Sequence, residues 1–232
     1  NYYFSNYQVS DQEIYKMTLL DSIYYKKLDL SWNIGTLRYD LRFSNLYKIA
    51  SYSKIFHKFL THNNFTKYNE YKFFKKKYRV NAIYNNNFDR ESVAFQRLLA
   101  TKKLKNINQF DLLDKNFNKK KYFASIINSK VVLSLFGWGE ICYRDWESVI
   151  LGTPFIKPEM NYLDTWPNIY IPYKTYYPVN LGLENLDEII DFSISSDELS
   201  KEMIINSQNI IKSIRNDSGR MFCEHFKKII NF

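Results

Sequence analysis

The residues with the clearest chemical potential lie between Phe136 and Glu147, which read Phe-Gly-Trp-Gly-Glu-Ile-Cys-Tyr-Arg-Asp-Trp-Glu. Two glycines near the start of this segment allow backbone N–H groups to approach an anion. The N-terminus of a following helix also favours negative charge. We therefore expect a phosphate-bearing ligand at the turn formed by Gly137, Trp138 and Gly139.

Three charged side chains follow this turn at helical spacing. Glu140, Arg144 and Glu147 stand at i, i+4 and i+7, so a helix over 140–151 would place them on one face. A carboxylate there can accept both hydroxyls of a ribose, and Arg144 can neutralise a diphosphate. Lys157, just past the next expected strand, would add a second positive charge. The alternative is structural: Glu140 caps the helix and Arg144 pairs with a glutamate.

Strands and helices are expected to alternate around this segment. The pattern predicts strands at 79–84, 104–107, 130–135 and 153–156, and helices at 89–101, 118–128, 140–151, 183–192, 197–214 and 217–230. The helix at 89–101 would have an Asp89 cap and apolar positions at Val93, Phe95, Leu98 and Leu99. Because parallel strands need helical crossovers, we expect an α/β fold with a doubly wound, parallel, Rossmann-like sheet. Its ligand would lie at the carboxyl ends of the strands.

Composition excludes several classes of protein. The chain has 232 residues, of which 45% are hydrophobic and 18% aromatic, which excludes a disordered chain. Two cysteines exclude a disulfide scaffold, and three scattered histidines argue against a metal site. The chain starts at Asn1 and shows neither a leader nor a run of about 18 apolar residues, so we expect a cytoplasmic location.

The basic excess lies in the first part of the chain. The net charge is +9; residues 1–130 hold 24 Lys or Arg against 10 Asp or Glu (+14), and residues 131–232 hold 9 against 14 (−5). Basic residues are interleaved with aromatic residues at 72–79, and a second run lies at 119–121. A solvated face is the favoured interpretation, ahead of an anionic membrane or glycolipid. Nucleic acid is not expected, because the second half of the chain is acidic.

Residues 136–147, followed by Gly152, 155–158 and 163–167, resemble the carboxy-terminal donor-binding half of bacterial GT-B glycosyltransferases. They are most similar to the exostosin-like enzymes that build surface polysaccharides such as O-antigen and capsule. The resemblance covers about residues 79–190. It implies transfer of a sugar from a nucleotide-sugar donor to a surface glycan or glycolipid, without a metal or another cofactor.

The resemblance also implies roles for individual residues. Gly137 and Gly139 would lie near the phosphates. Glu140 and Arg144 would be catalytic, and Arg144 would stabilise the leaving phosphate together with Lys157. The other expected donor-binding residues are Trp138, Tyr143, Glu147 at the ribose, and Thr165 and Trp166 over the base or sugar. The general base or nucleophile stays open among Asp29, Asp40 and Asp89.

Two domains are expected. Residues 79–232 would form the nucleotide-sugar-binding domain, and residues 1–78 a reduced or incomplete acceptor-side domain, onto which the helix at 217–230 crosses back. If the basic half is more than a solvated face, the resemblance implies that it faces an anionic acceptor or makes peripheral contact with the inner face of an anionic membrane. The alternatives are a non-catalytic nucleotide-sugar or glycan-binding module and a basic nucleic-acid-binding protein.

Overall fold

The computed structural model describes residues 3–5, 7–9, 28–30, 68–72, 76–84, 90–105, 110–111, 118–137 and 139–230. Contacts divide the chain into two units. The sheet unit comprises Tyr68–Asn161 and Tyr170–Asn209, and the terminal unit comprises Asn1–Lys67, Tyr162–Ile169 and Ile210–Phe232. The sequence predicted a single boundary between residues 78 and 79. The observed division differs, because the later segments Tyr162–Ile169 and Ile210–Phe232 group with the amino-terminal part.

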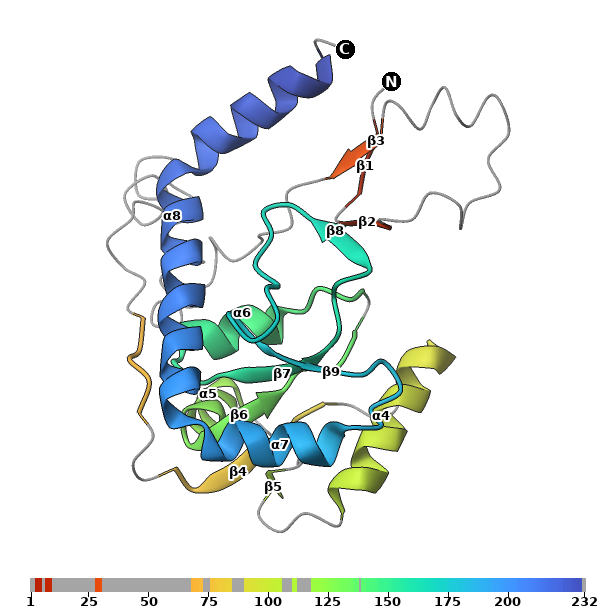
Figure 1. Ribbon diagram of the computed structural model, residues 1–232, viewed down its shortest axis with the longest axis vertical. Helices are drawn as coiled ribbons and strands as arrows, with labels where there is room; N and C mark the ends of the chain where they lie inside the picture. The colour runs from red at the N-terminus through yellow and green to blue at the C-terminus, as the bar shows by residue number, and fades with distance from the viewer. Residues whose placement is uncertain are drawn as a thin grey trace. The chain divides into compact units, whose positions relative to one another are not determined.

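The sheet unit is built on five parallel strands (Figure 1). These are β4 (Tyr78–Asn81), β5 (Phe110–Asp111), β6 (Ser129–Leu133), β7 (Phe155–Pro158) and β9 (Tyr177–Val179), in the spatial order β5-β4-β6-β7-β9. The register places Val80 opposite Val131, and Leu133 opposite Ile156. The chain adds β5 on one side of β4 and then β6 on the other side, so the direction of strand addition reverses between β4 and β6. The carboxyl ends of these two strands therefore form the topological switch point, the usual ligand position in such sheets.

Helices cover both faces of this sheet. They are α4 (Glu91–Leu104), α5 (Lys119–Ile127), α6 (Tyr143–Ile150), α7 (Leu186–Ser195) and α8 (Asp197–Ile230). On one face a buried cluster joins Leu133 of β6 to Leu104 of α4, Ile190 of α7 and Met203 of α8. On the other face, α5 and α6 are tied to the sheet by hydrogen bonds and an ion pair. The expected α/β fold with a parallel sheet is confirmed.

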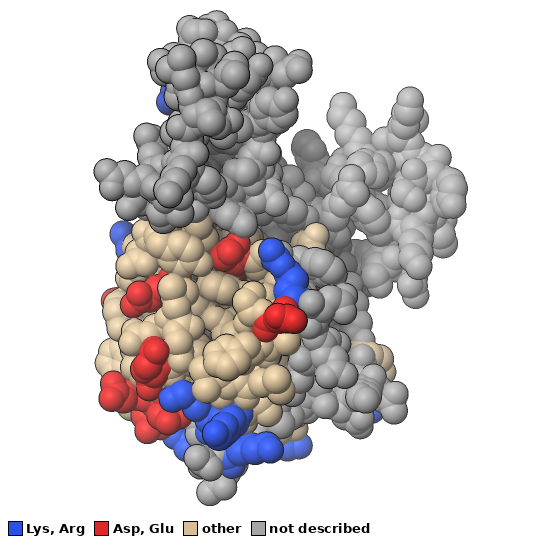
Figure 2. Space-filling view, turned by 90° about the vertical axis from the view of Figure 1, so that its right-hand side faces the viewer, with Lys and Arg blue, Asp and Glu red and all other residues tan. Residues whose placement is uncertain are grey.

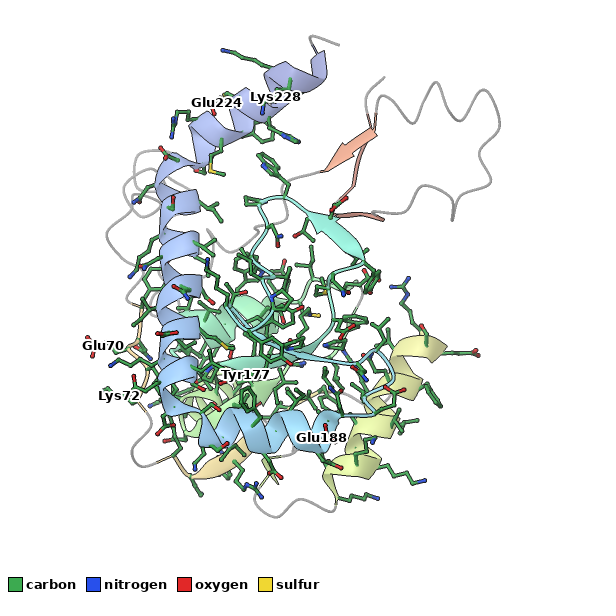
Figure 3. All side chains as sticks on the ribbon, in the orientation of Figure 1. Glu70, Lys72, Tyr177, Glu188, Glu224 and Lys228 are labelled. Atoms are coloured by element: carbon green, nitrogen blue, oxygen red, sulfur yellow. The ribbon has the colours of Figure 1, made fainter. Side chains whose placement is uncertain are left out.

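Polar contacts at the edge of the sheet attach the last helices. The hydroxyl of Tyr177 on β9, labelled in Figure 3, is buried 2.9 Å from Ser200 Oγ of α8. Glu188, also labelled there, lies on the exposed side of α7. Across the described part of the chain, no helix combines the length and the apolar character needed to cross a membrane.

Several element boundaries differ from those expected. Leu104 is the fully buried last residue of α4 rather than the start of a strand, and the short strand β5 follows at Phe110–Asp111. Asp89 lies outside the described residues, and Arg90 is the N-cap of α4. The helices expected at 197–214 and 217–230 are one continuous helix, α8. No proline interrupts it, and Gly219 inside it has room on all sides.

The described part of the terminal unit includes two small strand pairs and the second half of α8. β1 (Tyr3–Ser5) pairs in parallel with β3 (Leu28–Leu30). β2 (Tyr7–Val9) pairs antiparallel with β8 (Leu163–Thr165), so the start of the chain meets the segment that follows β7. The Trp166 ring stacks on His225 of α8 with a centroid distance of 4.0 Å.

Gly152, which ends α6, is expected to tolerate no side chain. Its φ is +74°, and a Cβ atom would lie 2.6 Å from the backbone oxygen of Asn69. Gly152→Ala is therefore expected to lower the free energy of unfolding by at least about 2 kcal/mol. Urea unfolding measures this change. Gly219→Ala, in the open interior of α8, is the matched control and is expected to stabilise by about 0.5–1 kcal/mol; a similar effect of both variants would contradict the prediction.

Candidate functional site

A pocket of about 400 Å³ opens in the sheet unit where β6 ends and α6 begins. The described residues that line it are Arg97, Tyr122, Leu135, Gly137, Gly139, Ile141, Cys142, Tyr143, Arg144 and Glu147. They come from α4, α5, the loop after β6 and the first turns of α6. The pocket thus lies at the carboxyl edge of the sheet, beside the switch point between β4 and β6.

The glycine turn after β6 is held in place by α4. The backbone N–H of Phe136 donates to Gln96 Oε1 at 3.3 Å. The carbonyl of Phe136 accepts from Arg97 Nη2 at 2.8 Å and from Nε at 3.2 Å. Within the turn, the N–H of Gly137 donates to the carbonyl of Gly139 at 3.0 Å. Two consecutive residues of α4 therefore fix both polar backbone groups at the start of the turn.

Two arginines give the pocket its positive charge. Arg97 is buried, and that burial lowers the pKa of its guanidinium, an effect increased by the positive charge of Arg144. Arg144 stands in the first turn of α6, and its buried Nε has no hydrogen-bond partner among the described residues. Neighbouring cations destabilise each other, so an anion between them would be favoured.

A carboxylate lies in the same pocket. Glu147 is 8% exposed, and its Oε2 accepts a hydrogen bond of 2.7 Å from the Tyr122 hydroxyl of α5. Burial raises the pKa of Tyr122; the positive charge of Arg144 opposes this shift, and the negative charge of Glu147 adds to it. Tyr122 therefore stays protonated and donates to Glu147. The pocket thus combines cationic donors with an acceptor that is oriented by a second helix.

The start of α6 is fixed by the buried carboxylate of Asp145. Its Oδ2 accepts from the backbone N–H of Cys142 at 3.2 Å and from the Tyr170 hydroxyl at 2.7 Å, and Oδ1 accepts from Ser134 Oγ. Oδ2 also forms an ion pair of 3.0 Å with Lys157 Nζ, and both side chains are 0% exposed. This capping arrangement makes α6 begin at Tyr143 rather than at residue 140.

The observed bounds of α6 and β7 correct two expectations about charged residues. Glu140 precedes the helix, so it does not share a helical face with Arg144 and Glu147, and it does not line the pocket. Lys157 was expected just past a strand but lies inside β7, where it points toward α6 and pairs with Asp145. It does not line the pocket either.

The structure brings about half of the expected site residues together. Gly137, Gly139, Tyr143, Arg144 and Glu147 all line the pocket. Thr165 and Trp166 belong to the terminal unit and do not line it. Four positions fall outside the residues or side chains that the structure describes, namely Trp138, Asp29, Asp40 and Asp89.

Arg97 and Tyr122 line the pocket but were not predicted from the sequence. Arg97 lies in the buried stripe of α4, at i+4 from Val93 and i−3 from Ala100. A lone arginine in an otherwise apolar helical stripe is the signal that could have identified it, because a buried cation needs an acceptor. Tyr122 follows the lysine run at 119–121, and nothing in its local pattern distinguishes it.

Cys142, which lines the pocket, is not activated as a nucleophile. Burial raises the pKa of the Cys142 thiol, so this side chain stays protonated at neutral pH and is a weak nucleophile. Within the described ranges, no three His, Cys, Asp or Glu side chains are placed to hold a metal ion.

Comparison with protein-family models and with curated proteins finds no match for this chain.

Proposed function

We propose that the chain is a glycosyltransferase of the GT-B kind, which transfers a sugar from a nucleotide-sugar donor to a surface glycan or glycolipid. One observation carries the proposal. Two cationic side chains (Arg144 and Arg97) and an oriented carboxylate (Glu147) line one pocket at the switch point of a doubly wound parallel sheet. A nucleotide sugar presents the complementary groups, since its phosphates are anionic and its ribose carries two hydroxyls.

The chemistry follows from the charges of the pocket. When the sugar–phosphate bond breaks, negative charge develops on the leaving phosphate, and Arg144 would stabilise that charge more strongly than it does in the ground state. The first turn of α6 adds the positive end of its dipole at the same place. Glu147, oriented by Tyr122, would accept the ribose hydroxyls and position the donor.

Binding of free nucleotides is the first test of this proposal. Among UDP, GDP, CMP, ADP and dTDP, one is expected to raise the melting temperature by about 5–10 °C at a hundredfold excess over its Kd. Thermal-shift measurement of each nucleotide checks this. The control is Arg220→Ala, which removes an exposed arginine of α8 and should leave the shift unchanged.

Incubation of the chain with a nucleotide sugar distinguishes an enzyme from a binding module. The nucleotide sugar used is one that contains the nucleotide found in the thermal-shift screen. If it is bound and the free nucleotide is released over time, the chain transfers or hydrolyses the sugar. If it is bound without release, the module is the better description. If none of the five nucleotides shifts the melting temperature, the proposed donor site is wrong.

A further inference from the structure

Helix α4 has two chemically different faces. Its buried face carries Val93, Arg97, Ala100 and Leu104, which are spaced at i, i+4, i+7 and i+11. The same spacing recurs two residues earlier at Glu91, Phe95, Leu98 and Lys102, which we call the outer stripe. An offset of two residues rotates a helical position by roughly 200°, so the outer stripe lies on the opposite side of the helix.

The outer stripe is open to solvent. Phe95 is 68% exposed and Leu98 is 55% exposed, and Glu91 and Lys102 are exposed at either end. Within the described residues neither Glu91 nor Lys102 forms an ion pair. Figure 2 views the side of the molecule on which α4 lies in Figure 1, and it shows an uncharged area with acidic side chains on its left and basic side chains below it. Adjacent exposed apolar side chains framed by charges are typical of an interaction surface.

The order of residues in the outer stripe indicates a second copy of the same stripe as its partner. Glu91 and Lys102 are equidistant from the midpoint of the stripe, as are Phe95 and Leu98. Two antiparallel copies would therefore place each Glu91 opposite a Lys102 and each Phe95 opposite a Leu98. We propose that the outer stripe binds the outer stripe of a second copy of this chain, with the two α4 helices antiparallel about a twofold axis. Phe95 then packs on Leu98 of the second copy, and Glu91 pairs with its Lys102. Each contact occurs twice, as in an isologous interface.

The size of the surface predicts a weak dimer. The stripe extends over roughly 16 Å of helix, and exposed Leu181 lies nearby, since its carbonyl accepts from Gln96 Nε2 at 3.4 Å. Such a surface lies below the size of stable interfaces, so we expect a Kd on the order of 100 µM. The interface would cover the outer side of the helix whose Gln96 and Arg97 hold the glycine turn.

A charge-exchange experiment tests the dimer. The unmodified chain is studied by sedimentation velocity from about 10 µM to about 1 mM, and a monomer–dimer equilibrium is expected. Glu91→Lys and Lys102→Glu each replace two attractive contacts with two repulsive ones, so each variant alone should dimerise at least fivefold more weakly. An equimolar mixture of the two variants should restore dimerisation, because every charged contact is then attractive again. The double variant should also dimerise like the original chain.

Aspartate substitutions of exposed apolar residues complete the test. Phe95→Asp is expected to abolish the dimer, whereas Ile205→Asp, at a 46% exposed apolar position of α8, is expected to leave it unchanged. Circular dichroism establishes that each variant folds. A chain that stays monomeric up to about 1 mM would overturn the proposal, and so would a dimer that persists in Phe95→Asp or a mixture that does not recover. None of these outcomes depends on nucleotide binding.

Discussion

Replacing Asp145 by asparagine is expected to lower the free energy of unfolding by about 3–5 kcal/mol. Asparagine keeps the shape of the side chain but removes the negative charge that faces Lys157 Nζ at 3.0 Å. The ammonium group is then left in the interior, where its other neighbours include the rings of Phe136 and Tyr170 at 5.4 and 5.6 Å. These rings attract a cation far less strongly than a carboxylate does.

Urea unfolding of three variants separates the effect of the unpaired buried charge from other effects of the substitution. The double variant Asp145→Asn with Lys157→Met should recover part of the loss, because no unpaired charge remains buried. Asp191→Asn breaks the exposed pair with Arg79 and should change the free energy by less than about 0.5 kcal/mol. If Asp145→Asn costs less than about 1 kcal/mol, the buried pair does not stabilise the start of α6 as described.

Replacing Arg144 by alanine is expected to weaken binding of a nucleotide by about 10- to 150-fold, the loss expected for one hydrogen-bonded charged contact. Arg144 stands in the first turn of α6, and its buried Nε has no partner among the described residues, so a bound phosphate would supply one. Because Arg144 is not part of the buried pair of Asp145 and Lys157, the fold should survive its removal.

Isothermal titration with the nucleotide that gives the largest thermal shift measures this effect. Arg144→Lys retains the charge but loses the planar donor fork, so its affinity should fall between those of the alanine variant and the original chain. Glu140→Gln, close in sequence but outside the pocket lining, should bind normally. Equal losses in the Glu140 and Arg144 variants would place the ligand elsewhere.

Local patterns were sufficient to predict much of the fold. The apolar run at 131–133 and the helix expected over 118–128 correspond to β6 and α5. The structure adds an N-cap to α5, since Asn118 Oδ1 accepts from the N–H of Lys121. Periodicity did not predict β5, because its two residues obtain their structure from pairing with β4 and carry no pattern of their own. The helix expected at 89–101 is present as α4, but its expected apolar positions do not share one buried face, since Val93 is buried whereas Phe95 and Leu98 are exposed.

The candidate site was predictable where it depends on local turns and unpredictable where it depends on tertiary pairing. The glycine turn, Arg144 and Glu147 lie close together in sequence and in the pocket. The position expected for Lys157 was wrong, because its partner Asp145 is twelve positions earlier and contacts it only through the packing of α6 on β7. A lysine within an otherwise apolar strand indicates a buried ion pair, and Lys157 has that pattern.

The core around β6 also determines when the chain can fold during synthesis. That cluster includes Val80 of β4 and Met203 of α8, which are 123 residues apart. At translation rates of about 5–20 residues per second, roughly 6–25 s pass between the emergence of the first and the last member. During this interval Val131, Leu133 and Ile156 lack their full covering. The nascent chain therefore exposes the apolar residues of this sheet until its last helix has been made, a state that is prone to aggregation.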